Sequence, residues 1–351
     1  WLSEGISVHE ERQVDPSWGE QLTPKYREMI LGGELTPISR LSAAFLMPKT
    51  PLHLQFAYYE ASLVVEFLIE RYGPGAIRAV LNDLRDGEFI NTSLARHTAP
   101  METLESEFAT FARTKAEGLA PGLAWDRPEF SRDAGVNFES LMETWAAEHP
   151  TNFWALDFTA ESRVERKEWE AAKEPLQTLA ERFPQQTGGQ SALARLARVH
   201  RALGETNAEV EVLTRVVQRE AAAPEACLRL MELAAAAQNW PEVVRVADRY
   251  LAVNPLSPGP YRLLGEALQR SGTPERAIGV YETVLELEPP DPGRIHDQLA
   301  QLYLPIDRAT ARKHTVPALE EAPRNREALR RLLQLTPPPA GDTVPEIPNP
   351  R

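Results

Sequence analysis

The sequence predicts an all-α protein in which helices of irregular length are followed by a regular α-solenoid. Ala, Leu, Glu and Arg recur at helical spacing along nearly the whole chain. Most of the 30 prolines stand between these apolar-periodic stretches, where they begin or end helices. No period-2 run bounded by Asn-Gly or Asp-Gly indicates a β-hairpin. In the second half of the chain the helical segments come at a constant spacing, which is typical of stacked helical pairs.

Composition allows two domains and excludes several classes of function. The chain has 351 residues, and its 42% hydrophobic content suffices for two cores. With 38 Lys and Arg against 51 Asp and Glu, the net charge of −13 makes nucleic acid an improbable partner. The single cysteine, Cys227, excludes an internal disulfide framework and any multi-cysteine metal site. No apolar run reaches the length of about 18 residues that a transmembrane helix needs.

Changes in pattern divide the chain into four parts. Residues 1–117 hold irregular helices, 118–152 a linker and a packing helix, 153–335 the regular array, and 336–351 a tail with six prolines that we expect to be disordered. The sequence begins at Trp1, which already has the character of a packed residue. We therefore expect it to be a fragment of a longer protein.

The helices of the first part follow from apolar spacing and punctuation. Two of them are amphipathic helices, expected at 76–84 and 101–115.

The array has a countable period. Pro255, Pro289 and Pro323 are spaced by 34 residues, and each closes a segment that contains two helical patterns and a short turn. The frame defines five repeats and a capping helix that would cover the last apolar face. The repeats span 153–186, 190–223, 224–257, 258–291 and 292–325, and the cap spans 325–335.

The repeat at 258–291 resembles the tetratricopeptide family. It has an aromatic residue, Leu-Gly, a small residue, a second aromatic residue and a closing proline at the family's key positions, namely Tyr261, Leu264, Gly265, Ala277, Tyr281 and Pro289. The resemblance implies a superhelix whose concave groove, lined by the first helix of each repeat, binds a peptide or protein. The neighbouring repeats match more weakly but keep the same frame.

The resemblance also identifies candidate groove residues. These are Arg198, Arg201, Arg262, Glu266 and Arg270, with Glu232, Gln269 and His296 as further members. The mixture of Arg and Glu is compatible with a charged peptide. The alternative is that they are ordinary solvated side chains on an exposed helix face.

The opening segment Trp1-Leu2-Ser3-Glu4-Gly5 resembles the W-L-x-E-G segment of gluzincin zinc metallopeptidases, the thermolysin-like or peptidase MA-like group. The resemblance implies that residues 1–117 form the helical C-terminal lobe of such a domain, with Glu4 as the third zinc ligand. Two histidines and one carboxylate leave a coordination position for the water that attacks the peptide carbonyl. The alternative for Glu4 is a surface acid that is stabilised at a helix N-terminus.

A second segment carries the same resemblance. The helix from Tyr59 is similar to the one that follows in gluzincins, where a tyrosine hydroxyl stabilises the oxyanion, and this implies a catalytic role for Tyr59. The alternative is a core aromatic residue with its hydroxyl at the rim of the core.

The zinc-binding motif H-E-x-x-H of this family is not in the sequence. None of the seven histidines pairs with another at i, i+4, so the motif would have to precede Trp1. We therefore expect the fragment to be inactive and to bind no zinc, and the full-length protein to be a zinc metallopeptidase if that motif is present. The other interpretation is a non-catalytic tetratricopeptide scaffold with a degenerate peptidase-like domain. Relatives of the peptidase MA-like type suggest an exported or membrane-associated protein.

Overall fold

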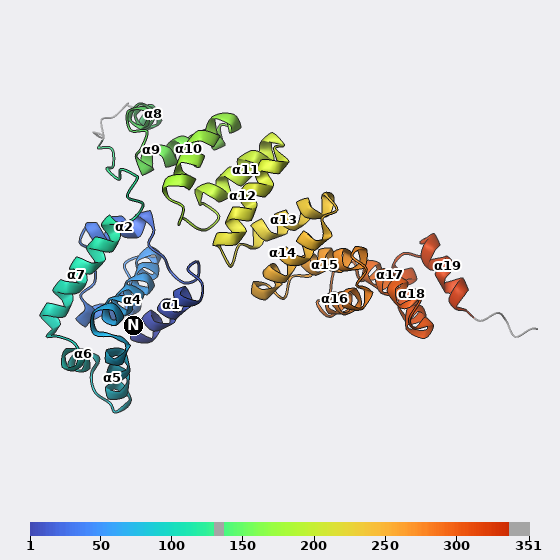
Figure 1. Ribbon diagram of the computed structural model, residues 1–351, viewed down its shortest axis with the longest axis horizontal. Coiled ribbons are helices and arrows are strands. Elements are labelled where there is room, and N and C mark those ends of the chain that lie inside the picture. The colour runs from blue at the N-terminus through green and yellow to red at the C-terminus, as the bar shows by residue number, and fades with distance from the viewer. Residues whose placement is uncertain (130–136, 337–351) are drawn as a thin grey trace, which may run out of the picture. The chain divides into compact units, whose positions relative to one another are not determined.

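The computed structural model describes residues 1–129 and 137–336, and these are helical nearly throughout (Figure 1). The described residues contain no β-strand, and an isolated bridge between Ala124 and Asn152 is their only β-type pairing. The all-α prediction is therefore confirmed. The chain forms two compact units, Trp1–Ala223 and Pro224–Arg351. The tail predicted to be disordered lies, apart from Thr336, outside the described residues.

The first unit begins with a lobe, residues 1–117, built around the 22-residue helix α4 (Pro51–Tyr72). This helix is apolar on almost every side, and eleven of its residues are buried, as expected of a helix that its neighbours surround. In chain order the lobe comprises α1 (Leu2–Val14), α2 (Pro24–Leu31), the 3-10 helix η1 (Ile38–Arg40), α3 (Leu41–Leu46), α4, α5 (Pro74–Arg85), α6 (Ile90–His97) and α7 (Met101–Glu117).

Helix α1 crosses α4 at Gly5 with almost no space between the two backbones. A Cβ atom added at Gly5 would lie 2.6 Å from the carbonyl oxygen of Ala61 and 3.1 Å from Cγ2 of Val65. An ion pair of 2.9 Å between Arg12 and Glu66 joins the same two helices. The glycine of the opening motif is therefore a packing requirement of this helix crossing.

A buried acid and a half-buried one hold the segment that connects α2 to α3. Oε1 of Glu60, on α4, accepts a hydrogen bond of 2.6 Å from the backbone N–H of Thr36. Oε1 of Glu105, on α7, accepts from both the N–H and the hydroxyl of Ser39. Glu60 is 1% exposed, and burial raises its pKa to about 8. Burial thus favours its neutral form, which costs less to bury than the carboxylate.

An aromatic cluster ties the lobe to the first repeat. The ring of Trp125 stacks on Phe153 at a centroid distance of 4.8 Å, and the guanidinium of Arg27, on α2, lies 4.7 Å from the Trp125 centroid. Arg127 covers the ring of Trp154 at 3.5 Å and also pairs with Glu28 of α2. Residues of the predicted linker thus contact both the lobe and the repeats through cation–π and stacking interactions.

The rest of the first unit consists of α8 (Phe138–Glu148) and the first two helical pairs. These pairs are α9 (Phe153–Glu165) with α10 (Trp169–Arg182), and α11 (Ala192–Leu203) with α12 (Thr206–Arg219). From α8 to α12, each helix packs against the next one along the chain. The two pairs lie within residues 153–186 and 190–223.

The second unit continues the same pattern. Its helices are α13 (Pro224–Ala236), α14 (Trp240–Val253), α15 (Pro258–Arg270), α16 (Pro274–Glu286), α17 (Pro292–Tyr303), α18 (Arg308–Glu321) and α19 (Arg326–Leu335). The predicted cap is α19, which packs on α18. An ion pair of 2.7 Å between Arg331 and Asp297 joins it to α17, and the Arg331 side chain is only 7% exposed. Loss of either partner would leave a buried charge unpaired, so this pair fixes the position of the cap.

We predict that Gly5→Ala destabilises the lobe by about 1–3 kcal/mol, because the new methyl group forces α1 away from α4. The measurement is the free energy of unfolding by chemical denaturation. Gly75→Ala is the matched control: it also lies in a helix, but no atom lies within 4 Å of its added Cβ, so its stability should be unchanged or slightly higher. Equal stability of the two variants would contradict the close crossing.

Candidate functional site

A groove in the second unit is lined by the first helices of three successive repeats. It has a volume of about 810 Å³ and is bordered by α13, α15 and α17. We call it the α15 groove, after its central helix. That helix contributes Arg262, Glu266, Gln269 and Arg270. Glu266 lies four residues after Arg262, and Gln269 and Arg270 lie three and four residues after Glu266, so the four side chains share one side of the helix.

Four apolar or aromatic side chains form part of the lining, and we call them the floor of the groove. Leu228 of α13, Leu263 of α15 and Ile295 of α17 line it together with Tyr281 of α16. A Cβ at Gly265 would lie 2.7 Å from the Tyr281 ring, so this glycine allows the ring to reach under α15. Tyr281 is 3% exposed, and burial raises its pKa to about 12. The floor can therefore hold an apolar side chain, while the walls supply hydrogen bonds and charge.

Most charges of the groove are compensated within the protein. Arg262 pairs with Asp291 at 3.2 Å, and Arg270 lies 4.0 Å from Glu266. Glu232 of α13 pairs with Arg229 at 3.3 Å. The groove is thus of mixed charge.

Beside the groove, two histidines join α17 to α18. Nδ1 of His296 lies 2.9 Å from Nδ1 of His314, and Tyr303 stacks on the His314 ring. The Tyr303 hydroxyl donates to Glu282 of α16 at 2.7 Å. Burial lowers the pKa of both histidines. Only one of the two facing nitrogens can carry a proton at this distance, so the contact requires that at least one ring is neutral.

The structure brings together only some of the predicted groove residues. Arg262, Glu266 and Arg270 line the α15 groove, as do Glu232 and Gln269. His296 is half-buried against His314 and does not line the groove. Arg198 and Arg201 are exposed on α11 in the other unit, where Arg198 donates to the carbonyl of Gly189.

The two residues of the peptidase resemblance lie in different environments. Glu4 is exposed in the first turn of α1. Tyr59 is 2% exposed within the core of the lobe, where its ring stacks on Tyr26 at a centroid distance of 5.3 Å. Burial raises the pKa of Tyr59. Its ring therefore has the surroundings of a core aromatic residue.

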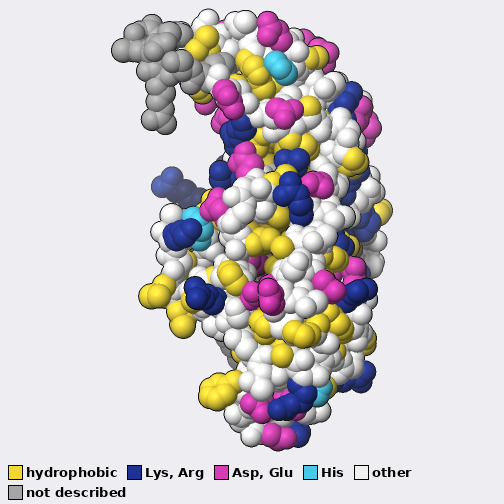
Figure 2. Space-filling view, turned by 90° about the vertical axis from the view of Figure 1, so that its left-hand side faces the viewer, with side chains coloured by type: hydrophobic (Ala, Val, Ile, Leu, Met, Phe, Trp, Pro, Cys, Tyr) yellow, Lys and Arg dark blue, Asp and Glu magenta, His cyan; other side chains and the backbone are white. Residues whose placement is uncertain are grey.

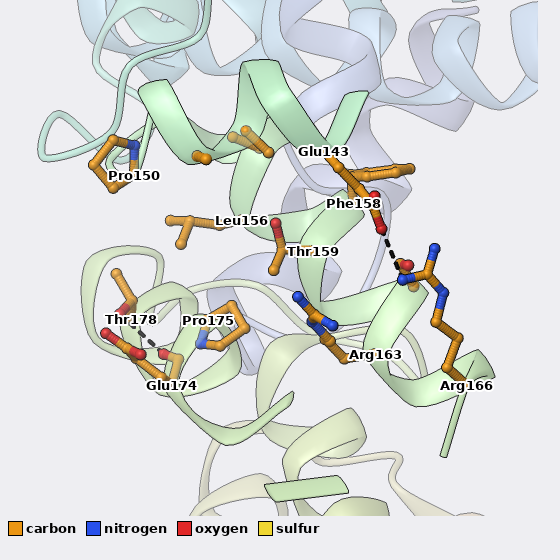
Figure 3. Close-up of a pocket in the computed structure, with 14 residues that line it drawn as sticks. Glu143, Pro150, Leu156, Phe158, Thr159, Arg163, Arg166, Glu174, Pro175 and Thr178 are labelled. Atoms are coloured by element: carbon orange, nitrogen blue, oxygen red, sulfur yellow. Dashed lines mark hydrogen bonds and ion pairs between the residues drawn. The ribbon is translucent and has the colours of Figure 1, made fainter. Parts of the chain in front are cut away.

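A second cavity, of about 510 Å³, lies among α8, α9 and α10 in the first unit (Figure 3). Figure 3 shows Pro150, Leu156, Thr159 and Pro175 around the opening. Its two arginines are engaged within the protein: Arg166 pairs with Glu143 at 2.7 Å and with Glu139, and Arg163 pairs with Glu168. The cavity spans a single helical pair and α8, whereas the α15 groove spans three repeats.

The surface shows no concentration of one charge on the face drawn in Figure 2, where basic, acidic and hydrophobic side chains are intermixed. Among the described residues, no group of three or more His, Cys, Asp or Glu side chains is placed to hold a metal ion. In the same residues, no helix is both long enough and apolar enough to cross a membrane.

Sequence reasoning missed the part of the groove that α17 contributes. Arg294, Gln298 and Gln301 line it, yet their positions in the repeat differ from those of the α15 residues. A signal was present, because residues 294, 298 and 301 are spaced by four and three and so share a helix face. The tetratricopeptide pattern predicts His296 as the groove residue of α17 instead.

Comparisons with known proteins support one repeat of the array. Residues 261–295, which run from within α15 through α16 into the start of α17, match the family model of the tetratricopeptide repeat. No curated protein matches the chain.

Several solved structures are similar to part of the chain. YrrB, a tetratricopeptide protein with an unusual peptide-binding site, is 13% identical, with a TM-score of 0.44 over 55% of this chain and 97% of its own. MamA of Desulfovibrio magneticus is 18% identical, with a TM-score of 0.37 over 55% and 99%. A thermophilic tetratricopeptide protein of Thermus thermophilus is 20% identical, with a TM-score of 0.31 over 56% and 98%.

The histidine contact predicts an acid-sensitive joint between α17 and α18. An unfolded chain takes up protons on histidine as the pH falls below about 6.5, whereas burial lowers the pKa of His296 and His314 in the folded unit. Stability from this contact is thus present above pH 6.5 and lost as the pH falls further. We expect faster hydrogen exchange in α17 and α18 at pH 5.5 than at pH 7, after correction for intrinsic rates.

His314→Phe keeps a ring against Tyr303 and removes one titrating group, so it should reduce this acid sensitivity. His149→Phe, at the end of α8, is the control and should leave it unchanged. Equal acid sensitivity in the His314 variant and in the unmodified protein would refute the explanation.

Proposed function

We propose that this protein is an interaction scaffold and that the α15 groove binds an extended peptide segment of a partner protein. The observation that carries the proposal is the groove itself: about 810 Å³ across the first helices of three repeats, with an apolar floor and polar walls. That composition suits a peptide, which has apolar side chains to bury and backbone groups that need hydrogen bonds.

Two glutamines support a role in holding a peptide backbone. Gln269 of α15 and Gln298 of α17 line the groove, and within the described residues neither side-chain amide makes a hydrogen bond to another group of the protein. Each amide offers both a donor and an acceptor. An extended segment between them would satisfy groups that otherwise bond only to water.

The zinc-peptidase interpretation of the lobe is a separate prediction that rests on the sequence resemblance. In that interpretation Glu4 binds zinc and Tyr59 stabilises the oxyanion in a longer protein. The exposure of Glu4 is compatible with a ligand role. The burial of Tyr59 beneath Tyr26 favours a core role instead, and the Gly5 crossing gives the opening motif a structural purpose. The scaffold is therefore the function that we place first.

The groove can be blocked without disturbing the fold. Gly259 lines it, and no atom lies within 4 Å of a Cβ added there. We predict that Gly259→Trp fills the groove and weakens binding of peptides, selected on the full chain from an unbiased phage-displayed library, by about tenfold or more. Fluorescence anisotropy of the labelled synthetic peptides provides the affinity.

Gly279→Trp is the matched control. Gly279 is also an exposed helical glycine with no atom near its added Cβ, but it lies on α16 and does not line the groove. Its affinity should equal that of the unmodified chain. Selection of no peptide, or equal affinity of the two tryptophan variants, would refute the proposed function.

A further inference from the structure

One cation in the α15 groove has no acidic partner. Arg294, on the first turn of α17, is exposed and lines the groove, and it forms no ion pair with any described residue. The other charged residues of the groove lining, on α13 and α15, have partners at 3.2–4.0 Å. Arg294 therefore gives the groove its one uncompensated charge among the described residues.

The acids nearest to Arg294 along α17 and α18 are already engaged. Asp291 accepts from Arg262, and Asp297 pairs with Arg331 at 2.7 Å. Oε2 of Glu321, on α18, accepts from the backbone N–H of Gly293 at 2.8 Å, close enough that a Cβ at Gly293 would collide with it. Asp291, Asp297 and Glu321 would each have to break an existing contact before they could neutralise Arg294.

We infer that the peptide bound in the α15 groove carries an acidic side chain that pairs with Arg294. The inference rests on the proposed function and specifies the chemistry of the partner: an acidic residue beside an apolar residue that enters the floor at Leu263 and Ile295. A guanidinium binds a carboxylate through two parallel hydrogen bonds, which fixes direction as well as charge. A basic peptide could form ion pairs with Glu232 or Glu266 only by displacing the arginine partners of these two acids.

The position of Arg294 also sets the order of contacts along the peptide. Gln298 follows Arg294 by one helical turn on the same face of α17, so the acidic side chain and the backbone segment next to it are held by the same helix. Gln269 holds the segment from α15. Acidic and apolar residues are thus expected close together in the peptide.

The test is a double-mutant cycle on the full chain. The probes are a labelled peptide from the phage selection and its counterpart in which the acidic residue is changed to the corresponding amide. We expect Arg294→Gln to weaken binding of the acidic peptide about three- to tenfold and binding of the amide peptide hardly at all. Arg294→Glu should weaken acidic peptides further and, used as bait, should select basic ones. Arg276→Gln, an exposed arginine of α16 outside the groove lining, is the control.

The outcomes separate the two claims. If Gly259→Trp abolishes binding but the two Arg294 variants bind the acidic peptide as the unmodified chain does, the groove is confirmed and the acidic partner is refuted. Selection of peptides that lack an acidic residue would likewise refute the acidic partner while leaving the groove as the binding site. If Gly259→Trp binds as tightly as the unmodified chain, both claims fail. Additive effects of the two changes would also refute the pairing of Arg294 with the peptide carboxylate.

Discussion

The close contact between Gly265 and Tyr281 determines the geometry on which the groove depends. A helical pair cannot bury all of its apolar surface alone. Its two helices pack on each other, and the remaining apolar surface packs on the neighbouring repeats. At Gly265 no side chain separates α15 from the Tyr281 ring of α16. Arg262 and Gln269 lie one helical turn before and after Gly265, so the contact that fixes how α15 is rotated also places these two side chains, with Glu266, along the groove. In the lobe, Gly5 likewise allows α1 to pack directly on the backbone of α4, because no side chain separates the two helices at that point.

The sequence predicts the fold well where a local pattern determines it. The spacing of Pro255, Pro289 and Pro323 locates the helical pairs because a proline that follows a helix cannot continue it. The floor of the groove was predictable in part, since Gly265 and Tyr281 occupy key positions of the repeat. The contacts of the linker were not, because the packing of Trp125 between Arg27 and Phe153 joins residues far apart in the chain, and no periodicity records such a pairing.

The sequence places candidate residues on α13 and α15 but names none of the α17 residues that line the groove. Arg262, Glu266 and Arg270 line it, as does Glu232 of α13, whereas Arg294 was not among the candidates. Its importance comes from the engagement of Asp291, Asp297 and Glu321 by other groups. A sequence shows that these acids are nearby but not which of them is already paired. Charge compensation is a property of three-dimensional contacts, so counting Arg and Glu along α15 indicated only a mixed surface.

The central claim is that a peptide occupies the face formed by α13, α15 and α17. Hydrogen exchange of the full chain, measured by mass spectrometry with and without a selected peptide, tests it most directly. The account predicts slower exchange in segments of α13, α15 and α17 on binding, with little change in α8, α9 and α10. Protection confined to α8, α9 and α10, around the cavity that Leu156 and Pro175 line, would contradict it.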